Sequence, residues 1–213
     1  MFRRIEEAGI PYILIDRSFA GLAAHFVGVN DEEVGSLATQ HLIDTGCKRI
    51  AHIGGPALSS LLGRLEGYKR ALAKNNFVLD PELVMSTDRA EEHGDVPAYN
   101  ATQILLGQNP RPDGIFCYND LAAYGAISAV LDAGLRVPED VSVIGCGNLH
   151  YNKFLRVPLT SVDQQSAAIG QRAAKLALQL LEADQPIVPK PIYLEPRLVA
   201  RASTRKQKSA AQG

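Results

Sequence analysis

Polar side chains that are able to bind a small molecule follow several of the short apolar runs in this sequence. In chain order they are Asp16 and Arg17, Ser59, Ser60 and Arg64, Asp88 and Arg89, Asn119 and Asp120, and Asn148. Carboxylate, amide and guanidinium groups are planar and form paired hydrogen bonds, which suits a hydroxyl-rich molecule or a carboxylate. Ligands of open α/β sheets bind beyond the carboxyl ends of the strands. The pattern therefore indicates a small-molecule site, if the apolar runs are strands of such a sheet.

Several of these groups also have a purely structural interpretation. Asn119 and Asp120 are typical helix N-caps, and we expect Asp120 to cap the helix that follows. Arg64 equally fits an exposed position on a helix. Residues 54–56 (Gly-Gly-Pro) form a turn, and they lack the lysine and the Ser/Thr of a phosphate-binding loop.

Signatures of catalysis do not occur in the sequence. There is no GxSxG, no HExxH and no GxGxxG after a predicted strand. The five histidines show no metal-ligand spacing, and we interpret His41 and His52 as structural side chains that backbone groups satisfy. Cys117 and Cys146 lie within or beside apolar runs, which predicts small buried hydrophobes. We therefore expect no enzyme activity, no metal and no cofactor.

The apolar runs alternate with longer amphipathic stretches. We predict strands at residues 12–15, 27–29, 49–53, 83–85, 114–117 and 141–144. We predict helices at residues 31–46, 61–72, 99–106, 121–131 and 165–181, and Asn30 and Asp31 both offer N-cap side chains for the first of them. Four prolines between residues 186 and 196 leave room there only for short extended pieces. This alternation is typical of βαβ units and predicts an α/β fold with mostly parallel sheets covered by helices.

The length and the charge of the chain limit its domain organisation and the partners it can bind. The chain has 213 residues, of which 46% are hydrophobic, which fits one large domain or two small lobes. The last thirteen residues hold four of the 22 basic residues and no acid, so the rest of the chain has 18 basic and 23 acidic residues, a net charge of −5. An acidic surface binds phosphates poorly, and we expect that this chain alone does not bind DNA. We expect the basic terminus at residues 203–213 to be solvated and flexible.

The sequence predicts neither export nor membrane insertion. No apolar run approaches the roughly 20 residues that span a bilayer. Glu6 and Glu7 stand where a signal peptide needs an apolar stretch. The three cysteines form no CxxC pair, which is typical of a reducing compartment. We therefore predict a cytoplasmic protein without a membrane partner.

Six runs of residues carry a family resemblance. The most specific are residues 137–145 (VPEDVSVIG) and residues 158–162 (PLTSV). The others are residues 9–17, 40–51, 53–56 and 64–68. In order and spacing these runs extend over nearly the whole chain, and with them the sequence resembles the effector-binding domain of the lactose-repressor/galactose-repressor (LacI/GalR) family of bacterial transcription regulators.

The resemblance implies two Rossmann-like lobes with parallel sheets, of the periplasmic binding protein-like type I, that close on an effector. Three crossovers join the lobes in this family, and here they are expected near Asn30, residues 159–162 and residues 189–194. The implied division is residues 1–30 and 162–190 for the N-terminal lobe, and residues 31–161 and 191–202 for the C-terminal lobe. Effector binding shifts the lobe arrangement, and an N-terminal helix-turn-helix in a dimer reads that shift on operator DNA.

The same resemblance implies site residues. Asp16, Arg64, Asn119 and Gln164 fall on positions that contact the effector, and Arg17 and Arg89 fall on positions that often line the cleft. Arg64 would bind ring hydroxyls or a carboxylate in a bidentate manner. Asn119 would use both its donor and its acceptor. With Ser60, which follows the Gly-Gly-Pro turn, these residues form the predicted effector site.

The sequence departs from the family pattern inside the cleft. The family usually has an aspartate after the strand at residues 141–144, whereas residues 145–147 here read Gly-Cys-Gly. A position near Arg89 often carries an aromatic residue that stacks on the effector, and here it is arginine. Because an acid is lost and a cation gained, we hypothesise an acidic effector, a sugar phosphate or sugar acid, over a neutral sugar.

The largest departure is at the N-terminus. The DNA-binding headpiece, the hinge helix and the first βαβ unit of the N-terminal lobe are absent, so operator DNA would be bound only through the missing helix-turn-helix. We expect an incomplete N-terminal lobe with exposed apolar surface where the absent strands would pack. In this family the helix after Asn119 contributes to a dimer. Tyr124 and Ser128 are therefore candidate contacts of a homodimer; alternatively they face solvent.

Two other functions remain open. A periplasmic sugar-binding transport protein shares the two-lobed fold, but the absent signal peptide argues against it, and residues 64–68 and 137–140 look more like the regulators. An enzyme on an α/β sheet would need a nucleophile–base pair or a metal cluster, and the sequence offers neither.

Overall fold

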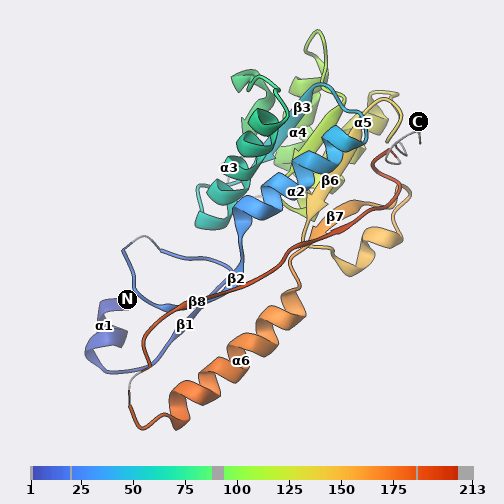
Figure 1. Ribbon diagram of the computed structural model, residues 1–213. Coiled ribbons are helices and arrows are strands. Elements are labelled where there is room, and N and C mark those ends of the chain that lie inside the picture. The colour runs from blue at the N-terminus through green and yellow to red at the C-terminus, as the bar shows by residue number, and fades with distance from the viewer. Residues whose placement is uncertain (1, 20, 88–93, 186, 206–213) are drawn as a thin grey trace, which may run out of the picture.

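The structure is a computed structural model that describes residues 2–19, 21–87, 94–185 and 187–205. Two candidate site residues of the sequence, Asp88 and Arg89, lie outside the described residues. The described chain forms two lobes, each built on its own sheet, with the larger lobe at the top of Figure 1 and the smaller lobe below it.

The larger lobe contains a six-stranded sheet in the order β4-β3-β5-β6-β7-β9. All neighbouring strands are parallel except β7 and β9, which are antiparallel. The strands are β3 (Ile50–Gly54), β4 (Val84–Ser86), β5 (Gly114–Cys117), β6 (Ser142–Cys146), β7 (Thr160–Asp163) and β9 (Arg197–Val199). The helices are α2 (Asp31–Asp44), α3 (Ser59–Lys74), α4 (Asp95–Leu106) and α5 (Asp120–Asp132), with short 3₁₀ turns η1 (Pro81–Leu83) and η2 (His150–Lys153).

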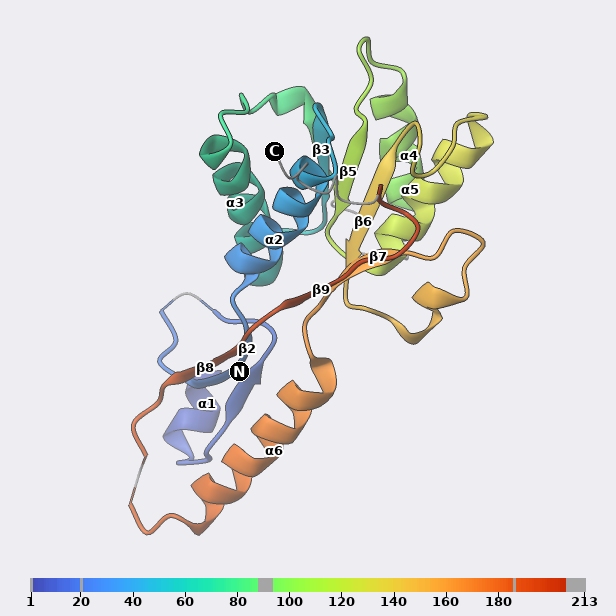
Figure 2. The same ribbon diagram turned by 45° about the vertical axis from the view of Figure 1, so that its right-hand side comes forward.

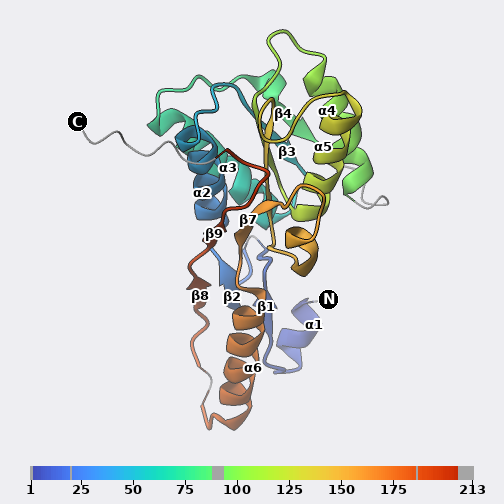
Figure 3. The same ribbon diagram turned by 90° about the vertical axis from the view of Figure 1, so that its right-hand side faces the viewer.

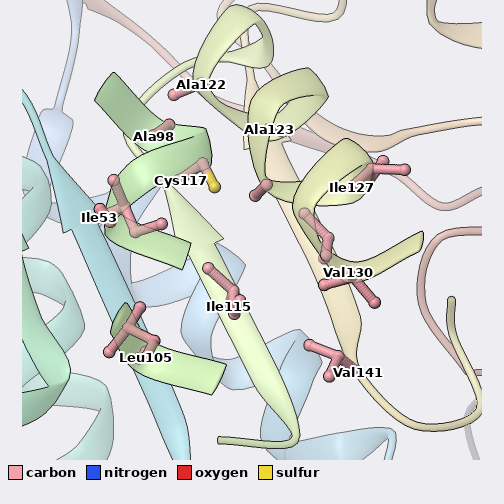
Figure 4. Close-up of a cluster of buried hydrophobic side chains, with 14 of the residues drawn as sticks. Ile53, Ala98, Leu105, Ile115, Cys117, Ala122, Ala123, Ile127, Val130 and Val141 are labelled. Carbon is pink, nitrogen blue, oxygen red and sulfur yellow. The ribbon is translucent and has the colours of Figure 1, made fainter. Parts of the chain in front are cut away.

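Helices cover both faces of this sheet. Helices α2 and α3 pack against each other on one face, and α4 and α5 pack against each other on the other face (Figure 1). Successive side chains of a strand point to opposite faces, so Ile53 and Ile115 join the α4/α5 core while Ile50 and Phe116 join the α2/α3 core. Figure 4 shows the α4/α5 core, where alanines allow the helices to lie close to the sheet.

The smaller lobe contains three parallel strands in the order β1-β2-β8. They are β1 (Ile13–Ile15), β2 (His25–Val29) and β8 (Pro191–Leu194). The long helix α6 (Ser166–Glu182) packs on β1 and β2 through Ile169, Ala173 and Leu176, which recur at helical spacing. Figure 3 shows the three strands beside α6, with the short helix α1 (Phe2–Glu7) beyond β1.

Three segments cross between the lobes, as Figure 2 shows. They run from β2 to α2, from β7 to α6 and from β8 to β9. Of the two predicted N-cap residues, Asn30 caps α2 by accepting a hydrogen bond from the Glu32 N–H (3.1 Å), so the first crossover ends where a helix begins. The predicted α/β fold is confirmed: it has two lobes with mostly parallel sheets, of the periplasmic binding protein-like type.

The predicted lobe boundary differs from the strand pairing at one point. Strand β8 pairs with β2, so Pro191–Leu194 lies in the smaller lobe, whereas the sequence prediction placed it in the larger one. The third crossover therefore follows β8 rather than preceding it. Pro191 is compatible with this edge position because β8 has a partner on one side only.

The predicted flexible terminus also begins too early. Ser203 and Thr204 are buried, and the Ser203 hydroxyl donates to the Val143 carbonyl (2.6 Å) and accepts from the Thr160 N–H (2.8 Å). The Thr204 hydroxyl lies 2.8 Å from the His41 ring. Through these hydrogen bonds the segment after β9 packs against the larger lobe. Because both residues are small and hydrophilic, the sequence pattern did not indicate this burial.

No helix among the described residues is long and apolar enough to cross a membrane. The three cysteines are free and buried, which confirms the interpretation of Cys117 and Cys146 as core residues. His41 and His52 are also buried, as predicted. Only His52 contacts a backbone group, through Nδ1 at 3.1 Å from the Phe116 carbonyl oxygen, whereas His41 Nε2 lies 2.8 Å from the Thr204 hydroxyl. Within the described residues His52 Nε2 has no hydrogen-bond partner.

Candidate functional site

A cavity of about 360 Å³ lies between the two lobes, at the carboxyl ends of strands from both sheets. Asp16 and Arg17 line it from the smaller lobe, and Gln164 lines it from the second crossover. The larger lobe contributes Pro56, Leu58, Ser60, Leu61, Arg64, Thr87, Gly94, Pro97, Tyr118 and Asn119. The structure thus brings six of the seven predicted site residues to one cleft, and Arg89 is the one outside the described residues.

Arg64 is the most buried charged side chain of the cleft. It is 4% exposed, its Nε donates to Asp31 Oδ1 (3.0 Å), and its Nη1 donates to the Tyr118 carbonyl. Within the described residues, Nη2 has no hydrogen-bond partner. The guanidinium is therefore held in a fixed orientation with one nitrogen left for a ligand, which excludes the surface interpretation of Arg64.

Close packing of α2 on α3 brings Asp31 to Arg64. A Cβ atom at Gly35 would lie 2.0 Å from the Arg64 carbonyl oxygen, and one at Gly67 would lie 2.1 Å from the Glu32 carbonyl oxygen. Glycine at these two positions lets the helix backbones touch. The first turn of α2 therefore faces the first turns of α3, and the ion pair forms across that contact.

Burial sets the charge state of this pair. It raises the pKa of Asp31 from 3.8 to about 6, more than the neighbouring Arg64 lowers it, and Asp16 adds to the increase. The Arg64 guanidinium stays protonated throughout the pH range in which Asp31 titrates. When Asp31 takes up a proton near pH 6, the positive charge of Arg64 is no longer compensated inside the cleft.

Asn119 is held in place by a hydrogen bond to the first turn of α5. Its Oδ1 accepts a hydrogen bond from the Ala122 N–H (2.7 Å), so Asn119 caps α5, and the prediction that Asp120 is the cap is wrong. The Asp120 carboxylate is instead buried and accepts hydrogen bonds from the Leu149 N–H (2.8 Å) and the Ser161 hydroxyl (2.6 Å). Because the cap uses the Asn119 oxygen, the side chain offers a ligand mainly its amide donors.

Three contacts describe the smaller-lobe side of the cleft. Gln164 Nε2 donates to Asp16 Oδ1 (3.2 Å), and Arg17 Nε lies 3.9 Å from Asp16 Oδ2. Asp16 has a positive φ of 65°, a strained backbone conformation for a residue other than glycine. The Asp16 carboxylate is therefore held at the mouth of the cleft between an amide and a guanidinium.

Asn148, another polar residue after a strand, does not line the cleft. Its side chain donates to Asp163 Oδ2 (3.2 Å) and accepts from Arg201 Nη2 (2.6 Å), so its polar atoms are used inside the larger lobe. The described residues include no group of three His, Cys, Asp or Glu side chains that could hold a metal ion.

Asp31 and Tyr118 belong to the site but were not predicted from the sequence. Asp31 looks like an ordinary acidic residue at a helix start, and only the helix contact reveals its partner. Tyr118 follows β5 directly, at the strand end where ligands bind, so that rule alone identifies it. It supplies an aromatic ring to a cleft in which the sequence analysis expected none.

Comparisons with known proteins agree with this geometry. The family model described as "Periplasmic binding protein-like domain" matches residues 39–204. The HTH-type transcriptional repressor PurR of Mannheimia succiniciproducens is 33% identical over 198 residues, which is 92% of this chain and 58% of that protein. The chain thus spans less than two thirds of the length of this curated relative.

Two solved structures are similar in fold as well as in sequence. A transcriptional regulator, CelR, in complex with cellobiose has a TM-score of 0.85 and 32% identity, covering 93% of this chain and 60% of that one. A LacI family transcriptional regulator from Enterococcus faecium with bound ribose has a TM-score of 0.83 and 26% identity, covering 97% and 75%.

Proposed function

Because this chain belongs to the periplasmic-binding-protein-like domain family, in the form found in LacI/GalR regulators, we propose that it is the effector-sensing domain of a bacterial transcription regulator. An effector between the lobes stabilises one lobe arrangement over another. We propose that operator DNA is bound by another part of the regulator, and that the regulator acts in the cytoplasm.

One observation carries the proposal. Polar side chains from both lobes converge on a single cleft, and Arg64 presents there a nitrogen that no described residue pairs with. A molecule that bridges Arg64 in the larger lobe and Asp16 in the smaller lobe couples its binding to the lobe arrangement. Sensing requires this coupling, and a site within one lobe would not provide it.

We propose a sugar acid or sugar phosphate as the effector, over a neutral sugar. Two structural relatives hold sugars, cellobiose and ribose, and Tyr118 offers a ring on which a sugar can stack. Arg17 and Arg64 line the cleft together with the carboxylate of Asp16, and below about pH 6 protonation of Asp31 leaves Arg64 uncompensated. These charges favour an anionic group on the ligand.

Isothermal titration with glucose, gluconate and glucose 6-phosphate at constant ionic strength tests this effector class. We expect the acid or the phosphate to bind more tightly than glucose, and Arg17→Gln to weaken that binding about tenfold. Arg111→Gln removes the same charge from an exposed position outside the cleft and should leave the affinity unchanged. Tighter binding of glucose than of both anions would rule out the acidic effector.

A homodimer is the proposed assembly. Leu121, Tyr124 and Ser128 lie on one stripe of α5, and the Tyr124 hydroxyl donates to Asn152 Oδ1 (2.6 Å) in η2. Beside this contact, Tyr151 and Leu149 expose apolar surface. This continuous patch of α5 and η2 is suited to a second copy of the chain.

Light scattering coupled to size exclusion tests the dimer. The chain has a mass of 23.0 kDa, and we expect twice that mass for the wild type. Tyr151→Glu should give the monomer mass, because it places a charge in the α5/η2 patch. A monomeric wild type, or a Tyr151→Glu variant that stays dimeric, would contradict this interface.

A further inference from the structure

A second cavity lies on the smaller lobe, away from the interlobe cleft. Its volume is about 410 Å³, and α6, β2 and β8 enclose it. Arg172 and Lys175 line it from α6, His25 lines it from β2, and Lys190 lines it directly before β8. We call these four side chains the basic pocket, and none of them lines the cleft.

The strand register places the basic pocket at the amino ends of the strands. Phe26 pairs with Pro191, and the Phe26 N–H donates to the Lys190 carbonyl (3.5 Å). His25 and Lys190 each precede this pair by one residue, so they lie side by side where β2 and β8 begin. The interlobe cleft is at the opposite end of the same sheet, so the two sites are separate.

The basic pocket carries three cations that the described part of the chain leaves uncompensated. Arg172 and Lys175 are three residues apart on α6 and share a helix face, and Lys190 faces them across the cavity lining. No carboxylate belongs to the lining. Within the described residues, none of the three cations forms an ion pair or a side-chain hydrogen bond. Like charges gathered in one concave surface create a positive potential that attracts an anion.

His25 provides an independent observation. The residue is only 6% exposed, its Nε2 lies 3.3 Å from the Ile187 carbonyl oxygen, and its buried Nδ1 has no hydrogen-bond partner among the residues that the structure describes. Nε2 must carry the proton in that contact, because a carbonyl only accepts. Buried polar atoms are nearly always paired, so Nδ1 is an unfilled position beside three cations.

We propose that the basic pocket is a second ligand site, and that it binds the phosphate group of a small phosphorylated metabolite. A phosphate carries about −1.5 to −2 charges at neutral pH and three strong acceptor oxygens. That charge matches three cations better than a single carboxylate does. Arg172 binds two of the oxygens in its planar fork, and the two lysines act as point charges.

Residue-resolved NMR tests the site directly. Inorganic phosphate, glucose 6-phosphate and glucose are titrated at constant ionic strength while the imidazole signals of His25 are followed, with His41 and His52 of the larger lobe as internal references. We expect a saturable shift of His25 with the two phosphates and none with glucose. Lys175→Gln should weaken phosphate binding about tenfold.

The matched control is Lys74→Gln, which removes an exposed lysine from α3 in the larger lobe and should leave phosphate binding unchanged. An equal loss in both variants, a His25 shift that does not saturate, or an equal shift with glucose would each overturn the proposal. Shifts confined to cleft residues such as Ser60 and Asn119 would also overturn it while supporting an anionic effector in the cleft. The NMR signals thereby separate the failure of one site from the failure of the other.

Discussion

The buried ion pair between Asp31 and Arg64 makes the stability of the larger lobe depend on pH. Burial raises the pKa of Asp31 to about 6 from its ordinary 3.8, so the folded protein holds this proton more tightly than the unfolded chain does. The contribution of Asp31 to the free energy of unfolding is then greatest below about pH 4, and it declines as the pH rises through about 6. The full change is about 3 kcal/mol.

Comparison with Asp31→Asn isolates this effect, since asparagine keeps the shape of the side chain and has no proton to lose. We expect the stability of the wild type relative to the variant, measured by urea unfolding, to fall between about pH 4 and pH 6. A stability difference that stays constant across this range would show that the Asp31 pKa is not raised.

A second prediction at the residue scale concerns Asn119. Its side chain caps α5 and also lines the cleft, so Asn119→Ala should lower stability by about 1 kcal/mol and weaken effector binding at once. Asn119→Asp keeps the capping oxygen but replaces the amide donors with a negative charge. That variant should retain stability in urea unfolding and lose affinity for an anionic effector in calorimetry. Equal affinity in all three proteins would remove Asn119 from the site.

At the scale of elements, the contact between α2 and α3 depends on the absence of one methyl group. A Cβ at Gly67 would lie 2.1 Å from a backbone oxygen of α2, so Gly67→Ala should separate the helices and cost about 2 kcal/mol or more. Gly170, within α6, has nothing within 4 Å of its would-be Cβ, and Gly170→Ala should stabilise by about 0.5–1 kcal/mol. Urea unfolding of both variants tests these two predictions. A Gly67→Ala variant with unchanged stability would contradict the close approach of the helices.

The positions of most elements follow from hydrophobic periodicity, and strand β5 lies at its predicted residues. Periodicity does not decide which of two neighbouring polar residues caps a helix. Asn and Asp are equally common N-cap residues, so residue type does not distinguish Asn119 from Asp120. Asp120 is buried in the core because its carboxylate accepts hydrogen bonds from Leu149 and Ser161, which lie far along the chain. The placement of β8 likewise depends on pairing with a distant strand rather than on its own residues.

The residues of the cleft divide in the same way. The rule that ligands bind at the carboxyl ends of strands identifies Asp16 and Asn119 from their positions in the sequence. Asp31 follows β2 by two residues, so the same rule brings it near the cleft, but its pairing with Arg64 depends on the glycine contact between two helices. Local patterns thus predict what a strand end presents, whereas contacts between helices are set by the packed structure.

At the scale of the whole molecule, the smaller lobe leaves one sheet edge open. Strand β1 pairs only with β2 among the described strands, and a cavity of about 430 Å³ beside it is lined mostly by apolar residues of β1 and α6. Ile10, Ile15 and Leu181 expose 50% or more of their surface there or nearby. This agrees with the exposed apolar surface expected from the sequence.

An open edge with apolar surface favours self-association. We expect species larger than a dimer at high protein concentration, and Leu181→Glu should reduce them while leaving the dimer intact. Ile104→Glu replaces an apolar residue of the larger lobe that is 61% exposed, against 72% for Leu181, and should have no such effect. Light scattering across a concentration series measures both variants, and the same loss in each would assign the association to general hydrophobicity.

The threading of the chain through both lobes determines when folding can finish during synthesis. Strand β8 completes the smaller sheet, β9 completes the larger one, and Ser203 and Thr204 fasten β9 to β6, β7 and α2. The two sheets therefore gain their last described strands only after β7 and α6 have been made, although α2 to β7 are made as one continuous stretch. A ribosome that stalls before Pro191 holds two unfinished lobes with exposed strand edges, a target for chaperones and proteases.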